Sequence, residues 1–328
     1  MDVFVTGGSG FLGQHLLRTL VAAGHPVRAL ARSEQAAAVV KRCGAGVVLG
    51  DTADPDALRD GMAGCDTVVH AAALTAQWGP RERFEVVNVE GTAAVLEAAR
   101  WSGVARVVHV STEAVLADGH PLVRVDETRP RPVRVVGEYG RTKGLAEDLV
   151  LAANCAELTT AAVRPRLVWG PDDTSILPEI VKAANAGRFA WVDGGHYLTS
   201  TCHVANVCAG ILLAAERGRG GEAYFLTDGE PVSFREFLTA LAATAGAELG
   251  DRSVPRWLLA GVAASAEAAW RWLPLRGEPP LTRTFLALSG QEMTVDDGKA
   301  RRELGYRPVI TREQGLAGLA AGGVPDQP

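Results

Sequence analysis

The chain has 328 residues and a formal net charge of −5, with 47% hydrophobic and 22% charged residues. This length is sufficient for one α/β domain with a smaller lobe and a substantial buried core. The acidic balance excludes the basic surface that nucleic-acid binding requires, so the Arg-rich run at 129–134 is interpreted as solvated loop charge.

Short apolar runs alternate with helical patterns through the first half of the chain. The helices are predicted at 11–23, 34–42, from 55, 84–101 and 141–156, and the strands at 3–6, 27–31, 47–49, 67–70, 107–110 and 160–163. Such alternation is typical of a parallel sheet covered by helices on both faces. The predicted fold class is therefore α/β, a doubly wound (Rossmann) sheet in residues 1–165.

The pattern changes after Pro165, where Gly and Pro become frequent and the predicted elements are short. Helices are expected at 178–186 and 234–245, separated by irregular segments. We interpret residues 166–328 as a smaller C-terminal α/β lobe that covers the strand ends and binds substrate. The apolar helical pattern at 204–215 is the exception, because residues 200–220 are expected to pack back on the sheet.

The cysteines are five in number and scattered, which favours reduced thiols over a disulfide framework. The Cys202-His203 pair with Cys208 fits no usual four-ligand spacing, so no metal site is predicted. The first strand begins at residue 3 and leaves no room for a targeting peptide, which predicts a cytoplasmic protein. The apolar stretch 257–275 contains Glu267 and Arg271, so a packed helix is expected there rather than stable membrane insertion, with a membrane-surface helix as the alternative.

A glycine-rich loop, Thr-Gly-Gly-Ser-Gly-Phe-Leu-Gly, follows the first strand at residues 6–13. In a dinucleotide site one such glycine forms a tight turn, one admits the pyrophosphate and one allows helix and strand to pack closely. The first amides of the next helix then bind the phosphate charge. We predict cofactor contacts at Gly7, Gly10, Phe11, Leu12 and Gly13.

The end of the second strand indicates which nucleotide binds. Binders of NAD usually place an acid there for the ribose hydroxyls, whereas this chain has Arg32 and no acid before Glu34. An Arg suits the 2′-phosphate of NADP, so NADP is preferred and NAD remains open. Asp51 and Thr52, after the third strand, are expected near the adenine.

The pair Tyr139 and Lys143 is four residues apart in a chain that contains only four Tyr and four Lys. A phenol is a poor base at neutral pH, because its pKa is near 10. An ammonium one helical turn away, together with the positive nicotinamide, would stabilise the phenolate. Thr112 or Ser111, at the end of a buried strand, would hold the substrate oxygen while Tyr139 exchanges the proton.

These features together resemble the extended short-chain dehydrogenase/reductases, and most of all the branch of 3β-hydroxysteroid dehydrogenases and dihydroflavonol reductases. The matching segments run along the chain: the glycine loop, Gly50-Asp51, His70-Ala71-Ala72, Asn88–Thr92, Ser111-Thr112, Tyr139–Lys143, Arg164-Pro165, Trp169–Pro171, His203–Val207, Lys299–Arg301 and Leu304–Pro308.

The resemblance implies roles for individual residues. Tyr139 would be the acid/base, Lys143 its activator and ribose ligand, Thr112 the hydroxyl that binds the substrate oxygen, and Ser111 a helper. It further implies that Ala71 and Ala72 line the cofactor cleft, and that Arg166 and Val168 approach the nicotinamide end.

One departure separates the chain from the sugar-nucleotide dehydratases of the superfamily, which follow the Ser-Thr pair with two acids. Here the pair is followed by Glu113-Ala114, which disfavours a dehydratase. The preferred interpretation is an NAD(P)-dependent enzyme that interconverts a secondary alcohol and a ketone. A nucleotide-sugar 4-epimerase and a non-catalytic dinucleotide-binding regulator remain alternatives.

The substrate pocket is less well defined by the sequence. The side chains of Gln77, Trp78, Trp169, Trp191, Tyr197 and the 257–272 region are expected either to form an apolar small-molecule pocket or to be core of the lobe. The cations Arg188, Arg252, Arg256 and Arg283 would instead suit a nucleotide diphosphate. By analogy with the superfamily, the helices at 84–101 and 141–156 are expected to form a homodimer interface.

Overall fold

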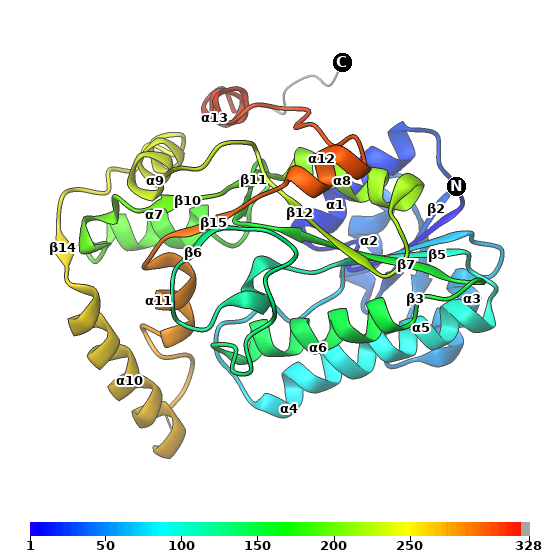
Figure 1. The fold of residues 1–328 in the computed structure, drawn as a ribbon, viewed down its shortest axis with the longest axis horizontal. Helices are drawn as coiled ribbons and strands as arrows, with labels where there is room; N and C mark the ends of the chain where they lie inside the picture. The colour runs from blue at the N-terminus through cyan, green and yellow to red at the C-terminus, as the bar shows by residue number, and fades with distance from the viewer. Residues whose placement is uncertain (274, 323–328) are drawn as a thin grey trace.

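The computed structural model describes residues 1–273 and 275–322 and contains a seven-stranded, all-parallel sheet (Figure 1). The strand order is β12-β7-β5-β4-β1-β2-β3. From β1 the chain first adds strands on one side, β2 and β3, and then on the other, beginning with β4, so the switch point of the topology lies beside β1. In that order the strands span Glu222–Leu226, Thr159–Pro165, Arg106–Val110, Thr67–His70, Val3–Thr6, Val27–Ala31 and Gly46–Leu49. Such a switch point is where open α/β sheets bind ligands.

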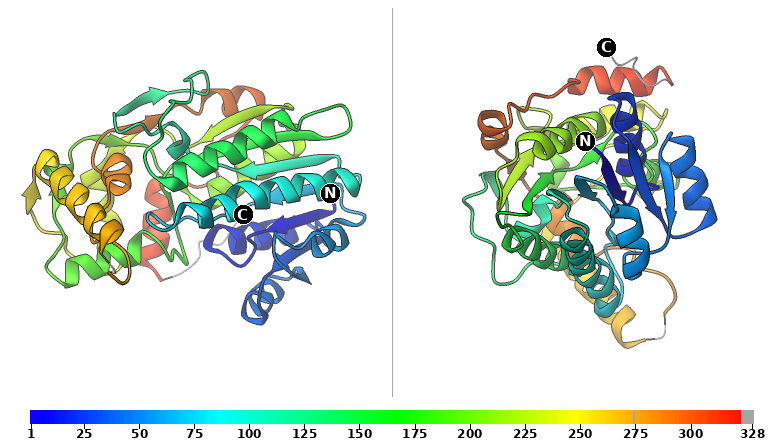
Figure 2. Two further views of the ribbon diagram at one scale, coloured as in Figure 1. Left: turned by 90° about the horizontal axis from the view of Figure 1, so that it is seen from below. Right: turned by 90° about the vertical axis from the view of Figure 1, so that its right-hand side faces the viewer.

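Helices cover both faces of this sheet (Figures 1 and 2). Side chains alternate across each strand, so Val3 and Val5 of β1 pack on one face and Phe4 on the other. The first face carries α1 (Phe11–Ala22), α2 (Glu34–Arg42) and α8 (Val204–Arg217). The second carries α3 (Pro55–Met62), α5 (Gly91–Trp101) and α6 (Glu138–Ala152), and the predicted doubly wound fold is confirmed.

Two predicted helices begin earlier than expected. The helix predicted at 84–101 begins with α4 (Arg81–Phe84) and passes through a π-helical segment, η1 (Glu85–Glu90), before α5. Helix α6 begins at Glu138 rather than at residue 141, so Tyr139 lies in its first turn. Helices α5 and α6 run side by side along the sheet (Figure 1).

The C-terminal half returns to the sheet in two places. Strand β12 pairs with β7 as an edge strand, and α12 (Gly298–Glu303) lies against it. Leu304 and Tyr306, which follow α12, are buried in the same core as α1 and α8. The division into domains at residues 165 and 166 stays a prediction.

The lobe is built from short, widely separated segments. A four-stranded sheet has the order β13-β10-β15-β6, from Val232–Ser233, Leu198–Thr199, Met293–Val295 and Leu122–Val125. Two-residue strands form the pairs β8 (Val168–Trp169) with β11 (Cys202–His203), and β9 (Trp191–Val192) with β14 (Ser253–Val254). The lobe helices are α7 (Leu177–Asn185), α9 (Phe234–Ala243), α10 (Arg256–Trp272), α11 (Arg283–Ser289) and α13 (Arg312–Ala320). Helix α10 extends away from the sheet (Figure 1), and no helix in the described ranges is long and apolar enough to cross a membrane.

Candidate active site

The glycine loop between β1 and α1 has room only for glycine at two positions. Gly7 has a φ of 75°, and a Cβ there would lie 2.6 Å from the Ala72 nitrogen. A Cβ on Gly13 would lie 2.1 Å from the Gly7 oxygen, closer than any real contact. The loop thus holds helix, strand and the Ala71–Ala72 segment in close contact at the switch point.

The N-terminus of α1 opens toward the space that a pyrophosphate would need. Gly10 is the N-cap residue and provides no side-chain cap, whereas Ser33 caps α2 and Asp54 caps α3. The first amides of α1, those of Phe11 and Leu12 included, therefore have no competing side-chain acceptor from the cap. A helix of this kind fits an anionic ligand.

The predicted adenosine-end residues lie at the carboxyl ends of β2 and β3. Arg32 is exposed, and its guanidinium makes no hydrogen bond or ion pair with any residue in the described part of the chain. Asp51 is exposed and accepts hydrogen bonds from Thr52 Oγ1 at 3.2 Å and from the Ala53 nitrogen at 3.3 Å. Ala72 donates its N–H to Thr6 Oγ1 at 3.2 Å.

Glycines on both sides of Tyr139 let the start of α6 approach its neighbours closely. Gly137, with a φ of 79°, packs against Thr284 of α11, where a Cβ would lie 2.3 Å from Oγ1. A Cβ on Gly140 would lie 2.6 Å from the carbonyl oxygen of Ala114. Tyr139 is consequently held between the sheet, the 3-10 helix η2 (Glu113–Leu116) and the lobe.

Tyr139 and Thr112 form one polar cluster at the end of β5. Burial raises the pKa of Tyr139 and the negative charge of Glu113 raises it further, whereas a hydrogen bond with Thr112 opposes both. Thr112 donates its hydroxyl proton to Glu113 Oε2 at 2.8 Å and accepts from the Ala114 nitrogen at 3.2 Å. This environment favours the protonated form of the phenol.

Glu113 is tied to the lobe by a buried ion pair. Its Oε1 lies 2.9 Å from Arg166 Nη1, and both side chains are almost fully buried. The second nitrogen of Arg166 donates to the Leu288 carbonyl of α11 at 2.6 Å. The guanidinium predicted to approach the nicotinamide end is thus bound to protein groups, and Val168 lies nearby in β8, paired with Cys202. Their contact with cofactor stays a prediction.

Lys143 lies one turn after Tyr139 and points to the sheet. Its Nζ lies 2.9 Å from His109 Nε2 and 2.6 Å from the Val110 carbonyl oxygen, and the side chain is 2% exposed. Burial lowers the pKa of Lys143 to about 7, although the negative charge of Glu147 opposes this. The two contacts leave one ammonium hydrogen for a further acceptor such as a ribose hydroxyl.

Behind Lys143 lie two histidines, His70 and His109, to which the sequence interpretation assigned no role. His70 and His109 are register partners on β4 and β5, with ring centroids 5.1 Å apart. His70 hydrogen-bonds Thr6 Oγ1 at 2.7 Å and Thr92 Oγ1 at 2.9 Å, and burial lowers its pKa to about 3. The sequence did contain a signal for this pair: a histidine lies near the carboxyl end of each of two successive apolar strands, β4 and β5.

Ser111, like Thr112, is buried where β5 ends. Its backbone N–H donates to the Val163 carbonyl at 2.8 Å.

Glu147, two turns after Tyr139, is buried and bound by both Arg164 and Arg131. Burial opposes ionisation, but the Arg164 guanidinium holds the pKa of Glu147 below its usual value.

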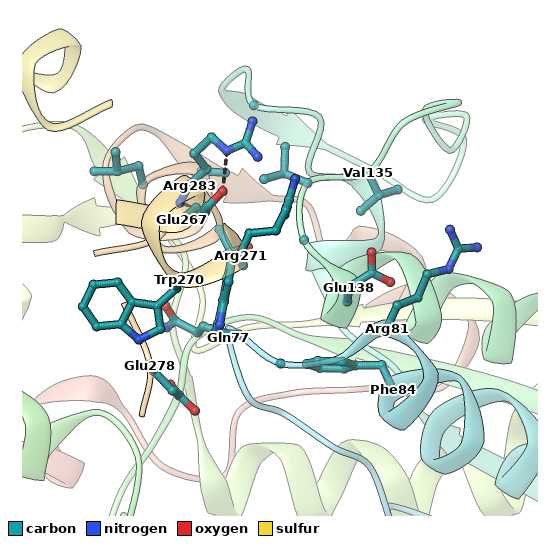
Figure 3. Close-up of a pocket in the computed structure, with 18 of the residues that line it drawn as sticks. Gln77, Arg81, Phe84, Val135, Glu138, Glu267, Trp270, Arg271, Glu278 and Arg283 are labelled. Carbon is teal, nitrogen blue, oxygen red and sulfur yellow. Dashed lines mark hydrogen bonds and ion pairs between the residues drawn. The ribbon is translucent and has the colours of Figure 1, made fainter. Parts of the chain in front are cut away.

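A cavity of about 1130 Å³ opens beside the start of α6 (Figure 3). Its lining includes Gly137 and Glu138, the two residues before Tyr139. Three aromatic side chains, Trp78, Phe84 and Trp270, also line it, together with parts of α10 and α11. The position fits a substrate pocket above the reacting end of the cofactor cleft.

The predicted pocket residues divide between this cavity and the lobe core. Gln77, Trp78 and the α10 region line the cavity. Trp169 and Trp191 do not, because they are fully buried in the lobe core with α9, and Tyr197 packs against that core. Of the four predicted cations, Arg256 and Arg283 line the cavity, and Arg283 is paired with Glu267 at 2.7 Å. No cluster of three His, Cys, Asp or Glu side chains suited to a metal ion is present in the described part of the chain.

The parallel sheet, glycine turn and Tyr-Lys helix define an oxidoreductase of the extended short-chain dehydrogenase/reductase class, within the NAD-dependent epimerase/dehydratase superfamily. Residues 4–256 match the model of the 3-beta hydroxysteroid dehydrogenase/isomerase family, and the chain belongs to that family.

Known proteins of similar sequence include reductases of oxo compounds and 3-beta-hydroxysteroid dehydrogenases. The chain is 53% identical to the 4-hydroxy-2-methyl-3-oxo-4-farnesyl-3,4-dihydroquinoline-1-oxide ketoreductase of Stigmatella aurantiaca, over 98% of this chain and 97% of that protein. It is 38% identical to a 2-alkyl-3-oxoalkanoate reductase of Stenotrophomonas maltophilia, over 98% and 99%. A dTDP-glucose 4,6-dehydratase structure from Streptomyces venezuelae, with NAD bound, is 26% identical and superposes with a TM-score of 0.75 over 98% of this chain and 96% of that one.

Proposed function

We propose that the protein is an NADP(H)-dependent reductase that converts a ketone on a mainly apolar small molecule into a secondary alcohol. The observation that carries the proposal is the position of Tyr139, in the first turn of α6, beside Thr112 and next to the cavity, where burial also raises the pKa of its phenol. The names of the two similar reductases point the same way, since both describe reduction of an oxo compound that carries an apolar chain.

In the proposed reaction the bound nicotinamide supplies hydride to the carbonyl carbon. Tyr139 donates its proton to the carbonyl oxygen as negative charge develops there. Thr112 orients the phenol and the substrate oxygen, and Glu113 orients Thr112 by accepting its proton. Lys143 is proposed to bind the nicotinamide ribose and to stabilise the phenolate left after proton transfer.

The preference for NADP rests on Arg32. Its guanidinium is exposed at the end of β2 and free of protein partners in residues 1–273 and 275–322, so it can pair with a 2′-phosphate. Replacing Arg32 with Ala is expected to weaken NADPH binding at least about tenfold and NADH binding little. Equal effects on both cofactors in a fluorescence titration would contradict the assignment.

The cavity supports an apolar substrate that also carries a polar or acidic group. Trp78, Phe84 and Trp270 provide apolar surface. Arg83, Arg134 and Arg271 also line it and make no ion pair within the described ranges. Long-chain 3-oxo acids and prenylated heterocyclic ketones are therefore the first compounds to test.

The test measures net cofactor consumption with a panel of such ketones. We expect one NADPH to be oxidised for each alcohol formed. An epimerase would convert a nucleotide sugar with no net change in cofactor, and a regulator would bind NADPH without turnover on any member of the panel. Either result would overturn the proposal.

We also propose a homodimer built on α5 and α6. Leu145 and Leu149 are exposed one turn apart on α6, and Val86 is exposed in η1. Sedimentation should give twice the monomer mass, and replacing both leucines with Glu should give the monomer.

A cytoplasmic location is proposed because all five cysteines are free thiols.

A further inference from the structure

Helix α10 presents an unusual face to solvent. Of its 17 residues, only Ala263 and Glu267 are buried. Trp257 and Trp272, at opposite ends of the helix, are 75% and 82% exposed, and Leu258 and Val262 are exposed between them. The apolar surface continues beyond the helix through Leu273 and Leu275. Apolar side chains exposed singly are common on soluble proteins, but several large ones exposed along one helix indicate an interaction surface.

The charges around this face suit an anionic partner. The only acid of α10, Glu267, is buried and bound by Arg283, whose backbone nitrogen and Nε both lie 2.7 Å from its carboxylate. Residues 252–276 contain four Arg and one Glu. Arg256 and Arg271 line the cavity on the inner side of α10, whereas Arg252 and Arg276 are exposed beyond the two ends of the helix. This segment is therefore basic in a chain whose net charge is −5.

The dimensions suit a helix that lies in a lipid interface. The two terminal tryptophans are 15 positions apart, which is about 22 Å along a helix. Trp side chains prefer the headgroup level of a bilayer, and a helix with basic edges and an apolar outer face lies parallel to the membrane plane. The Glu267–Arg283 pair fixes the opposite side of α10 to α11, so the apolar face points outward.

We propose that the outer face of α10 (Trp257, Leu258, Val262, Trp272 and the adjoining Leu273 and Leu275) docks on an anionic lipid bilayer. The inner side of the same helix provides Ala260, Trp270 and Arg271 to the cavity lining (Figure 3). A docked protein would thus place its cavity directly above the bilayer. This part rests on the proposed function, because it gives an apolar substrate a short path from lipid to Tyr139.

The test is sedimentation with vesicles in the absence of cofactor and substrate. The whole protein should bind vesicles of phosphatidylcholine mixed with phosphatidylglycerol, bind phosphatidylcholine alone more weakly, and lose binding as salt increases. Replacing Trp257 and Trp272 together with Ser should weaken binding at least about tenfold. The matched control is Trp101→Ser, since Trp101 is 68% exposed at the end of α5, and it should bind like the wild type.

Three results would overturn the proposal: no binding to either vesicle, equal binding by the double variant, or equal loss in the Trp101 control. If the double variant instead abolished a concentration-dependent self-association that occurs without lipid, the face would belong to a second copy of the chain. Turnover of a water-soluble short-chain ketone without vesicles tests the reductase separately, so failure of one proposal is distinguishable from failure of the other.

Discussion

The sheet half and the lobe of this protein are built by different means. In the sheet half, strands of four to seven residues alternate with helices, and the buried His70 is held by hydrogen bonds to Thr6 of β1 and Thr92 of α5. In the lobe, strands of two residues pair across long distances, as when β10 pairs with both β13 and β15. We therefore expect the sheet half to fix the reacting groups, while residues of both regions line the cavity.

The largest expected effect comes from the sheet half. Tyr139→Phe removes the proton donor, so kcat for ketone reduction should fall about 10³-fold while NADPH affinity changes only a few-fold. Steady-state kinetics and a fluorescence titration measure the two quantities. Tyr197→Phe is the control, because Tyr197 donates a partly buried hydrogen bond, to the Ser289 carbonyl at 2.6 Å, but lies in the lobe. Equal losses in both variants would remove the distinction between the two regions.

The Glu113–Arg166 pair joins the two regions, and its removal should have the next largest effect. Glu113→Gln takes away the negative charge that raises the pKa of Tyr139 and leaves the Arg166 charge uncompensated. Both changes favour the phenolate, so the pH midpoint of alcohol oxidation should move to lower pH. Reduction should slow on the order of 30-fold, which is about 2 kcal/mol.

A control separates this positioning role from general destabilisation. Asp297→Asn breaks another buried carboxylate contact, with Arg301 at 2.6 Å, outside the Tyr139 cluster. It should leave the pH profile in place. If Glu113→Gln slows turnover without any shift of the pH midpoint, Glu113 only supports the fold.

A smaller effect of another kind is expected in the lobe. Trp270→Ala removes apolar surface from the cavity, so KM for a long-chain ketone should rise roughly tenfold, about 1.4 kcal/mol, with kcat and NADPH affinity nearly unchanged. Trp101→Ala is the control for loss of an exposed indole. A fall in kcat without a rise in KM would show that the lobe shares in the chemistry.

The smallest effect concerns pH and the stability of the sheet half. Burial lowers the pKa of His70 to about 3, well below the value near 6.5 of an unfolded histidine. Between these values the unfolded chain binds more protons, so the free energy of unfolding decreases as pH falls below about 6.5. In His70→Asn the decrease from pH 7 to pH 5.5 should be smaller by about 1 kcal/mol, measured by denaturant unfolding. His120→Asn, at an exposed position before β6, should keep the wild-type slope.

The same contrast explains what could be predicted from the sequence. Strands β1, β2 and β4 and helix α2 have the predicted bounds, because local hydrophobic spacing and glycine signals determine them. The close approach of Thr112 and Tyr139 was also predictable from the order of motifs. The Glu113–Arg166 pair was not, because it depends on how β7 and η2 meet in space.

In the lobe, the sequence left more open for a physical reason. It allowed Trp169 and Trp191 either a pocket or a core position, because an aromatic side chain suits both environments, and both side chains lie in the core. Strand β12 gave no usable signal, because an edge strand of five residues in a Gly-rich region resembles a loop. Only the tertiary structure distinguishes these cases.

The most direct test of the central claim follows the hydride itself. The protein is incubated with NADPH deuterated on the reactive face of C4 and with a ketone that it reduces, and the alcohol is analysed by mass spectrometry. The account predicts one deuterium at the carbinol carbon of each alcohol, with an equal amount of NADP⁺ released. An unlabelled alcohol, or a stereochemically inverted product formed without release of NADP⁺, would contradict it.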